Sequence, residues 1–283
     1  MTATTELAPA PPAAPRGRRR PRAAGPAHLP SPPDDRERDS YLGAQHRWLG
    51  PATYVGYLLI VLSVAFFVGD HLWALLLLVP LAFSLVSTTL SLVTTVRRSR
   101  VTLPGHRALV EGWRPDRYPS VDVFLPSAGE DLAILENTFR HVRALAWPGD
   151  VAVYVLDDSA RPEVQTLALR AGFTYLTRPD RGWFKKAGNL RYGFEHSGGD
   201  LIAIFDADFV PRTDFLAELA PYFDDAATAI VQSPQYFDVH PRMNWLERAA
   251  GSTQVLFYRY VQPARDASGA AICVGTSAST TNT

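Results

Sequence analysis

Two aspartates, Asp206 and Asp208, follow a continuous apolar run at residues 201–205. A run of this length predicts a buried strand of a parallel sheet, and such sheets bind ligands beyond the carboxyl ends of their strands. Because two partly buried carboxylates this close repel by up to ~4 kcal/mol, a divalent cation beside them is favoured. Hard cations such as Mg²⁺ take oxygen ligands and often share them with substrate phosphates. The pair therefore indicates a metal site for a phosphate-bearing substrate, with a solvated turn as the alternative.

Acidic side chains also follow two earlier segments that are typical of strands. Ser127 and Glu130 come after the first segment, and Asp157 and Asp158 come after the second. The carboxyl ends of parallel strands meet at one edge of a sheet, so we expect these groups to converge with the later aspartates on one crevice. Each group alone would also fit a turn or a helix cap. Three acidic strand ends on one side favour a shared nucleotide and metal site.

Lys186 supplies the opposite charge. It opens a predicted helix at residues 186–196, and the N-terminal amides and dipole of a helix already favour an anion. A lysine at this place can neutralise a diphosphate, and Gly188 allows a ligand to approach the backbone closely. A solvated basic loop is the alternative interpretation.

These groups must be positioned by an alternating series of strands and helices that begins near residue 118. Apolar and β-branched runs predict strands, and spacings of three and four predict amphipathic helices between them. Repeated strand–helix units imply a mostly parallel sheet with right-handed crossovers and helices on both faces. The expected strands are 121–126, 151–156, 173–177, 201–205 and one opening at 229–231, and the expected helices are 131–146, 162–171, 186–196 and 213–223.

The N-terminal part differs in composition from this series. Residues 1 to about 45 are rich in Pro, Ala and Arg and cannot bury enough apolar surface to order, so we expect disorder. Uncharged segments at 52–69 and 72–96 predict two membrane-spanning helices, with a pair of buried core helices as the alternative. Arginines cluster before them at residues 16–22 and after them at residues 97–107, which predicts a hairpin with both ends in the cytoplasm.

The net charge and the cysteine content narrow the class of function further. The formal net charge is zero, so charge does not favour nucleic acid as a partner. The single cysteine, Cys273, excludes an intrachain disulfide and suits a catalytic region that faces the cytoplasm.

Six short motifs, taken in their order and spacing, resemble those of the processive family 2 glycosyltransferases, and within them the bacterial cellulose synthase catalytic subunits. The likeness covers residues 54–278. The motifs are Pro126-Ser127-Ala128-Gly129-Glu130, Asp157-Asp158-Ser159, Lys186-Ala187-Gly188-Asn189-Leu190, Asp206-Ala207-Asp208, residues 231–237 and residues 262–278.

The resemblance implies a GT-A fold and a membrane-bound inverting enzyme that extends a β-linked polysaccharide from a UDP-sugar, with UDP-glucose as the expected donor. It implies Mg²⁺ or Mn²⁺ as cofactor, and as partners the growing polysaccharide, the lipid membrane and other synthase subunits. A helix at residues 245–260 would lie along the membrane surface, with a buried aromatic face as the alternative. By resemblance, Ser127, Glu130, Asp157, Asp158, Lys186, Asn189 and Asp206 bind the nucleotide sugar, Asp208 with Asp206 binds the metal, and Gly275, Thr276 and Ser277 lie on the acceptor side.

The expected division is a disordered cytoplasmic tail at 1–48, two transmembrane helices within 49–98, and a GT-A domain at 118–283 that is incomplete at its C-terminus. The chain would be a multi-pass protein of the inner membrane, with its N-terminus and catalytic domain in the cytoplasm.

Two family motifs, Thr-Glu-Asp with the general base and Gln-x-x-Arg-Trp, do not occur in the sequence. Residues 279–283 depart from the family pattern and suggest a frameshift or a truncation, so we expect this chain alone to transfer sugar poorly. A synthase of the hyaluronan or chitin type, a lipid-linked sugar transferase and a non-catalytic UDP-sugar-binding remnant remain alternatives. A phosphatase of the haloacid-dehalogenase type, with Asp206 as nucleophile, would leave the other motifs unexplained.

Overall fold

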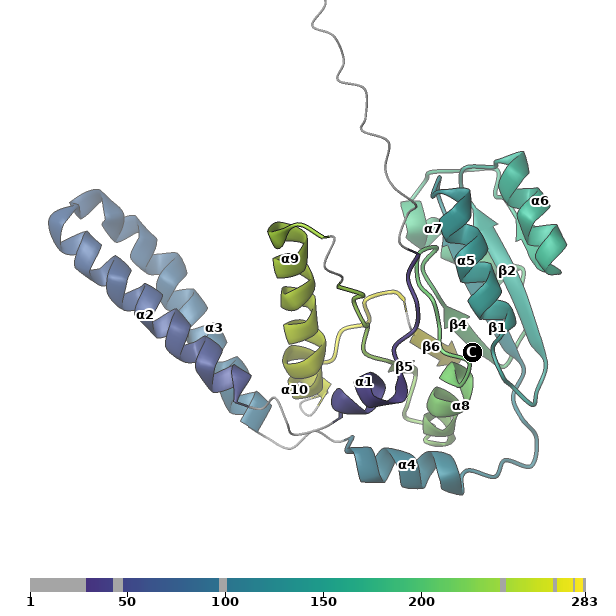
Figure 1. Ribbon diagram of the computed structural model, residues 1–283, viewed down its shortest axis with the longest axis horizontal. Helices are drawn as coiled ribbons and strands as arrows, with labels where there is room; N and C mark the ends of the chain where they lie inside the picture. The colour runs from purple at the N-terminus through teal and green to yellow at the C-terminus, as the bar shows by residue number, and fades with distance from the viewer. Residues whose placement is uncertain are drawn as a thin grey trace, which may run out of the picture.

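The described chain comprises a short N-terminal segment, a helical hairpin, and an α/β domain with further helices beside it (Figure 1). The computed structural model describes residues 29–42, 48–96, 101–239, 243–266, 269–276 and 278–281. The arginines at residues 16–22 and 97–100 and the predicted acceptor residue Ser277 lie outside the described residues.

A six-stranded mixed sheet, in the order β3-β2-β1-β4-β6-β5, forms the centre of the α/β domain. β1 pairs in parallel with β2 and β4, and β2 pairs in parallel with β3, as the alternating pattern predicts. β6 pairs antiparallel with both β4 and β5, and no strand is predicted from its sequence. The strands are β1 (Val121–Ser127), β2 (Val151–Asp157), β3 (Thr174–Leu176), β4 (Leu201–Ile204), β5 (Ile230–Gln232) and β6 (Ala278–Thr281).

Helices cover both faces of this sheet, which confirms the layered α/β arrangement. α5, α6 and α8 bury apolar side chains against one face, in a core that includes Leu135, Val164 and Phe215. α7 covers the other face, where Leu190 packs against the cluster around Phe124. The helices are α5 (Leu132–Arg143), α6 (Pro162–Ala171), α7 (Lys185–Glu195) and α8 (Phe215–Leu219), with the 3-10 helix η2 (Ala220–Asp224) after α8.

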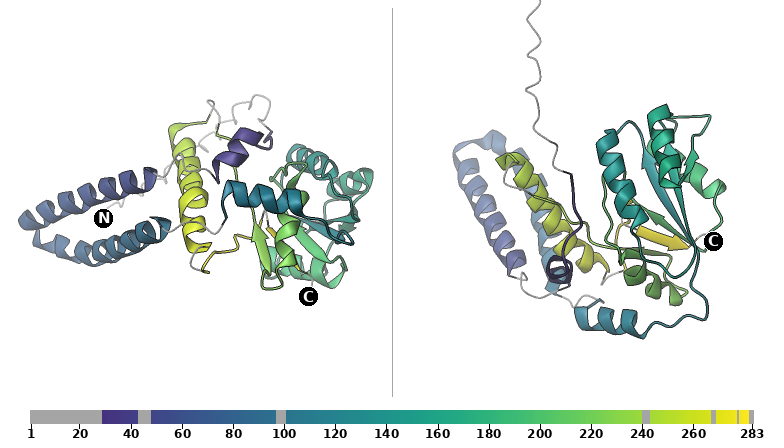
Figure 2. Two further views of the ribbon diagram at one scale, coloured as in Figure 1. Left: turned by 90° about the horizontal axis from the view of Figure 1, so that it is seen from below. Right: turned by 45° about the vertical axis from the view of Figure 1, so that its right-hand side comes forward.

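The hairpin stands apart from the sheet and consists of α2 (Leu49–Asp70), the 3-10 helix η1 (Leu72–Leu77) and α3 (Leu78–Val96) (Figures 1 and 2). Its surface is strongly apolar, since Phe66, Leu76 and Phe83 are each more than 70% exposed. Within the described ranges, no helix combines the length and the apolarity that crossing a membrane requires. The two predicted membrane spans therefore stay predictions.

Further helices lie between the hairpin and the sheet or below them (Figures 1 and 2). α4 (Leu103–Gly112) follows the hairpin. α9 (Trp245–Leu256) begins with a capping box, in which Asn244 and Glu247 each accept from the other's backbone N–H. The π-helix η3 (Phe257–Val261) and α10 (Gln262–Asp266) continue α9 without a break.

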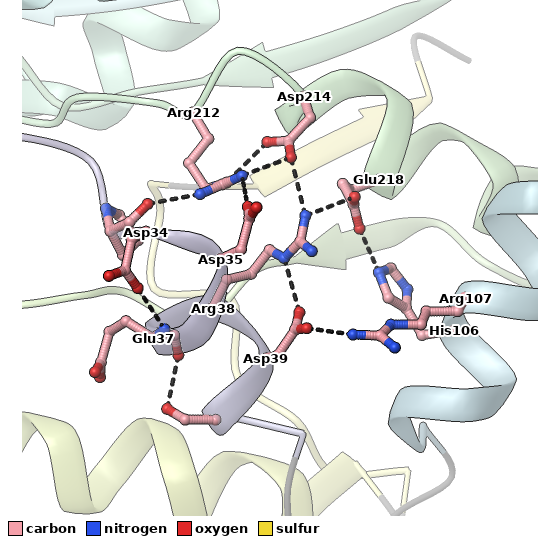
Figure 3. Close-up of polar contacts among 12 residues, drawn as sticks. Asp34, Asp35, Glu37, Arg38, Asp39, His106, Arg107, Arg212, Asp214 and Glu218 are labelled. Carbon is pink, nitrogen blue, oxygen red and sulfur yellow. Dashed lines mark hydrogen bonds and ion pairs between the residues drawn. The ribbon is translucent and has the colours of Figure 1, made fainter.

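Residues 29–42, here called the strap, lie against the domain and contain a helix. Residues 1–28 and 43–47 of the expected disordered tail lie outside the described residues, and that expectation stays a prediction. The strap contains α1 (Asp35–Ser40), whose N-cap Asp34 accepts from Glu37 N at 2.8 Å. Arg212 binds the carbonyl oxygen of Pro33 and the carboxylate of Asp35, each at 2.6 Å (Figure 3). The low apolar content of the strap is thus offset by ion pairs with residues far away in the sequence.

Candidate active site

The loop that follows β4 holds the two aspartates at the carboxyl edge of the sheet. The Asp206 N–H donates to the buried Thr276 Oγ1 at 2.9 Å, and the buried Thr138 of α5 donates to the Ala207 carbonyl oxygen at 2.8 Å. The Asp206 side chain is 37% exposed, and Asp208 is exposed. The loop is therefore fixed at its backbone while both carboxylates remain accessible to a ligand.

Lys186 meets Asp206 at this edge, as the sequence predicts for a shared site. Its Nζ forms an ion pair with Asp206 Oδ1. A Cβ placed on Gly275 would lie 3.8 Å from the same Nζ, so the chain just before β6 passes beside the pair. The structure thus brings together Lys186, the aspartate loop, Gly275 and Thr276, which are predicted for the donor and acceptor sides.

Asp157, at the end of β2, is fully buried and organises the neighbouring strand ends. It accepts hydrogen bonds from Ser127 Oγ at 3.3 Å, from the Ser159 and Arg161 amides at 2.9 and 3.0 Å, and from the Tyr175 hydroxyl at 3.0 Å. Burial, together with the hydrogen bond to Asp157, raises the pKa of Tyr175 to about 12. The carboxylate oxygens of Asp157 are therefore hydrogen-bonded within the protein.

Asp158 is paired with an arginine that sequence reasoning missed. Arg178 Nε and Nη2 each lie 2.7 Å from one oxygen of Asp158, and the two side chains are only 1% and 9% exposed. The hydrogen bond with Asp158 raises the pKa of Arg178 despite burial. A buried arginine leaves no periodic signal, and no motif here includes it.

Arg178 also explains why a side chain at position 188 has no room. A Cβ on Gly188 would lie 2.5 Å from Arg178 Nη1 and 2.3 Å from the Trp183 carbonyl oxygen. The space that the sequence assigned to an approaching ligand is therefore occupied by Arg178. Because Arg178 Nη2 also donates to the Lys185 carbonyl oxygen at 3.2 Å, it links Asp158 to the first turn of α7, which carries Lys186.

The remaining predicted donor-site residues are bonded within the protein. Asn189 is 3% exposed and donates to the Leu156 carbonyl oxygen at 2.6 Å, which ties α7 to β2. Glu130 accepts from the Ala128 amide at 2.7 Å and closes the turn after β1. Their contact with a ligand stays a prediction.

A metal at this edge would rely on few protein ligands. Among the described residues, no group of three or more His, Cys, Asp or Glu side chains is placed to hold an ion. Asp206 and Asp208 alone supply two carboxylates, and Mg²⁺ or Mn²⁺ bound by one or two carboxylates completes its shell with phosphate oxygens and water. The donor set therefore fits an ion that is shared with a phosphate-bearing ligand.

Tyr258, on η3, approaches the same edge from the C-terminal helices. It is 4% exposed, and burial, with a further contribution from the charge of Asp206, raises its pKa to about 12. Trp245, at the start of α9, is 75% exposed. The two alternatives for residues 245–260 thus apply to different residues: Tyr258 is buried near the site, whereas Trp245 faces outward.

A lysine at a helix N-terminus and acidic strand ends at one sheet edge are typical of α/β enzymes that bind a phosphate-bearing substrate. The chain belongs to glycosyl transferase family 2, whose model matches residues 122–281. It is therefore a glycosyltransferase, and its mixed sheet is GT-A-like.

Bacterial cellulose synthases are among the relatives. Cellulose synthase 1 of Komagataeibacter xylinus is 37% identical over 165 residues, which are 57% of this chain and 10% of that protein. The UDP-forming cellulose synthase catalytic subunit of Pseudomonas fluorescens is 36% identical over 157 residues, or 54% of this chain and 21% of that protein. The chain thus matches only a tenth to a fifth of the length of these relatives.

Two solved structures show a weaker likeness. A mannosyltransferase from Pyrobaculum calidifontis, in complex with GDP-Man and Mn²⁺, has a TM-score of 0.41 at 20% identity and covers 54% of this chain and 46% of its own. Glucosyl-3-phosphoglycerate synthase from Mycobacterium tuberculosis, with Mn²⁺ and UDP, has a TM-score of 0.40 at 17% identity and covers 66% of this chain and 63% of its own. Likenesses this weak add nothing to the assignment.

Proposed function

We propose that this glycosyltransferase domain binds a UDP-sugar, UDP-glucose in the first instance, and serves the extension of a β-linked polysaccharide. The observation that carries the proposal is the ion pair of Lys186 with Asp206 at the carboxyl edge of the sheet, with the exposed Asp208 two residues further along. The likeness to cellulose synthases supports the choice of donor and product.

The two halves of the donor would bind at opposite ends of this edge. Glu130, Asp157 and Asp158, together with Ser127 and Asn189, would form the nucleoside side. Asp206 and Asp208 would hold Mg²⁺ or Mn²⁺ against the diphosphate. A bound ion supplies a Lewis acid for the leaving nucleoside diphosphate. Lys186 would release Asp206 on binding and place its own positive charge beside the same phosphates.

The acceptor would approach from the loop that contains Gly275 and Thr276, and Ser277 follows them in the sequence. A general base must take the proton of the attacking hydroxyl, a role that typically contributes about 10²- to 10⁴-fold to the rate. The Thr-Glu-Asp motif that supplies this base in the resembling family does not occur among residues 1–283, so we assign the role to no residue named here.

The exposed apolar surface of α2 and α3 supports attachment to a lipid membrane. We propose that residues 49–98 form the membrane-attached part and residues 118–283 the transferase domain, which faces the cytoplasm.

Calorimetry with UDP, with and without Mn²⁺, tests the donor site. The full chain should bind UDP more tightly with Mn²⁺ present, and Asp208→Asn should abolish that gain because it removes an accessible carboxylate ligand. Asp116→Asn, which changes an exposed carboxylate distant in sequence from the motifs, is the matched control and should behave as wild type. UDP binding that is independent of Mn²⁺ would contradict the metal site, and preference for UDP-N-acetylglucosamine over UDP-glucose would favour a chitin- or hyaluronan-type synthase.

A further inference from the structure

The strap holds one residue of the π-helix η3 by three contacts. Arg259 Nη2 lies 2.6 Å from Glu37 Oε1, and Arg259 Nη1 donates to the Ser40 carbonyl oxygen at 3.1 Å. The Arg259 guanidinium also stacks 4.0 Å above the ring of Tyr41. The side chain of Arg259 is only 10% exposed, so the strap covers it. π-helical turns are rare and are found frequently at functional sites.

Side-chain hydrogen bonds connect the helix that carries Arg259 with the 272–276 loop, and this loop with the aspartate loop. Gln262, in the next helical turn, donates to the Ile272 carbonyl oxygen at 2.6 Å and accepts from the Ile272 amide at 3.2 Å. Four residues later, Thr276 Oγ1 accepts the Asp206 N–H at 2.9 Å. The Val274 N–H also donates to Gln232 Oε1 of β5 at 2.9 Å. The Asp206 backbone is therefore bonded to a loop that α10 and β5 hold together.

We propose that the strap is a positioning device for the donor site: by fixing Arg259, it fixes η3 and α10, and through the 272–276 loop it fixes Asp206. The partner that this surface of the domain fits is a segment of the same chain. Glu37 and Arg259 are positioning residues, because they act on the site only through Gln262 and Thr276. The effect on donor binding rests on the proposed function, whereas the effect on the Asp206 backbone does not.

Other side chains of the strap are held independently of η3. Arg38 Nη1 lies 2.9 Å from Asp214 and 3.0 Å from Glu218, and Arg212 binds Asp35 at 2.6 Å (Figure 3). These pairs dock α1 on α8 and on the residues just before it. Loss of the Arg259 contacts should therefore release η3 from the strap and leave α1 attached to α8.

Hydrogen exchange of the full chain tests the proposal directly. Arg259→Glu and Glu37→Arg should each raise exchange by about tenfold in the peptide with the Asp206 amide and in residues 269–276. The charge-swapped double variant, Glu37→Arg with Arg259→Glu, should restore part of the protection through the ion pair alone, which a general loss of packing would not. Arg36→Glu is the matched control, since Arg36 is exposed on the same helix and has no ion pair within the described residues.

UDP affinity with Mn²⁺ is the second readout. Arg259→Glu should weaken this affinity by about tenfold, because ligand groups must be held closely to their binding geometry, and the double variant should recover part of the loss. Glu37→Gln, a milder change, provides a variant that folds if the charge reversals do not. Unchanged exchange at Asp206 in these variants would overturn the proposal. Absence of UDP binding in the wild type would instead overturn the proposed function. The hydrogen-exchange result would then still show whether the strap positions the Asp206 backbone.

Discussion

At the scale of single residues, Arg178 contributes to stability because it neutralises a buried carboxylate. Removal of one partner from a buried ion pair typically costs about 3–5 kcal/mol, since the other charge is left unpaired. We expect Arg178→Met to lower the free energy of unfolding by an amount in this range, measured by urea denaturation. Asp158→Asn combined with Arg178→Met should cost less than Arg178→Met alone. Arg170→Met, on the exposed face of α6, is the control, and equal losses in both single variants would contradict the role of burial.

Tyr258 gives the site edge a pH dependence at high pH. Its pKa is raised to about 12 by burial and by Asp206, against an ordinary value of 10.0. The folded protein therefore retains this proton above pH 10 while the unfolded chain loses it. The resulting stabilisation is complete below pH 10 and is lost as the pH rises towards 12, by about 1.4 kcal/mol per pH unit.

Tyr258→Phe removes this titrating group. Its free energy of unfolding should fall less steeply between pH 10 and 12 than that of the wild type, measured by denaturation at successive pH values. A slope as steep as that of the wild type would show that Tyr258 ionises equally easily in the folded and unfolded states.

At the scale of elements, β6 closes the sheet between β4 and β5. Its register places Ser279 opposite Ala203 on β4 and Val231 on β5, and Ser279 is 3% exposed. Proline lacks the N–H that such a position needs, and each buried partner left unsatisfied costs about 1–3 kcal/mol. Ser279→Pro should therefore destabilise the domain strongly in thermal denaturation, whereas Ser279→Ala, which keeps the N–H, should be mild. A small effect of proline would contradict a central place for β6.

The sequence predicted correctly those helices and strands whose ends are marked by residues close by in the chain. Residues 162–171 form α6 with the expected bounds, because Pro at the start and Gly172 after the end, at φ +78°, signal both termini. β6 was missed because its short, polar sequence forms a strand only between two neighbours that are distant in the chain. The strap was missed for the same reason, since Arg212 stands 177 residues from Asp35.

The candidate site likewise contains some contacts that the sequence predicted and others that it did not. Sheet topology predicted that the acidic strand ends share one edge, and the motifs added Lys186 to it. Lys186 does pair with Asp206, whereas the convergence of all the acidic groups on one ligand stays a prediction. The pairing of Asp158 with Arg178 and the inward hydrogen bond of Asn189 depend on side-chain packing across the sheet edge. A spacing rule contains no information on that packing.

At the scale of the whole molecule, the hairpin of α2 and α3 stands apart from the sheet of the transferase domain (Figure 2). Phe66 and Phe83, on α2 and α3, are 73% and 76% exposed, and a surface of this kind is stable when lipid covers it. A lysine placed in the apolar part of a bilayer costs about 2.5–3.5 kcal/mol. Phe66→Lys combined with Phe83→Lys should therefore move the chain out of carbonate-washed membranes, measured by immunoblotting of the pellet and supernatant.

Leu169→Lys, at a 61% exposed position on α6, is the matched control and should leave the chain in the pellet. If the double variant stays in the pellet as well, the lipid contact is made elsewhere, and the exposed residues of α9, Trp245 and Leu246, become the next surface to change.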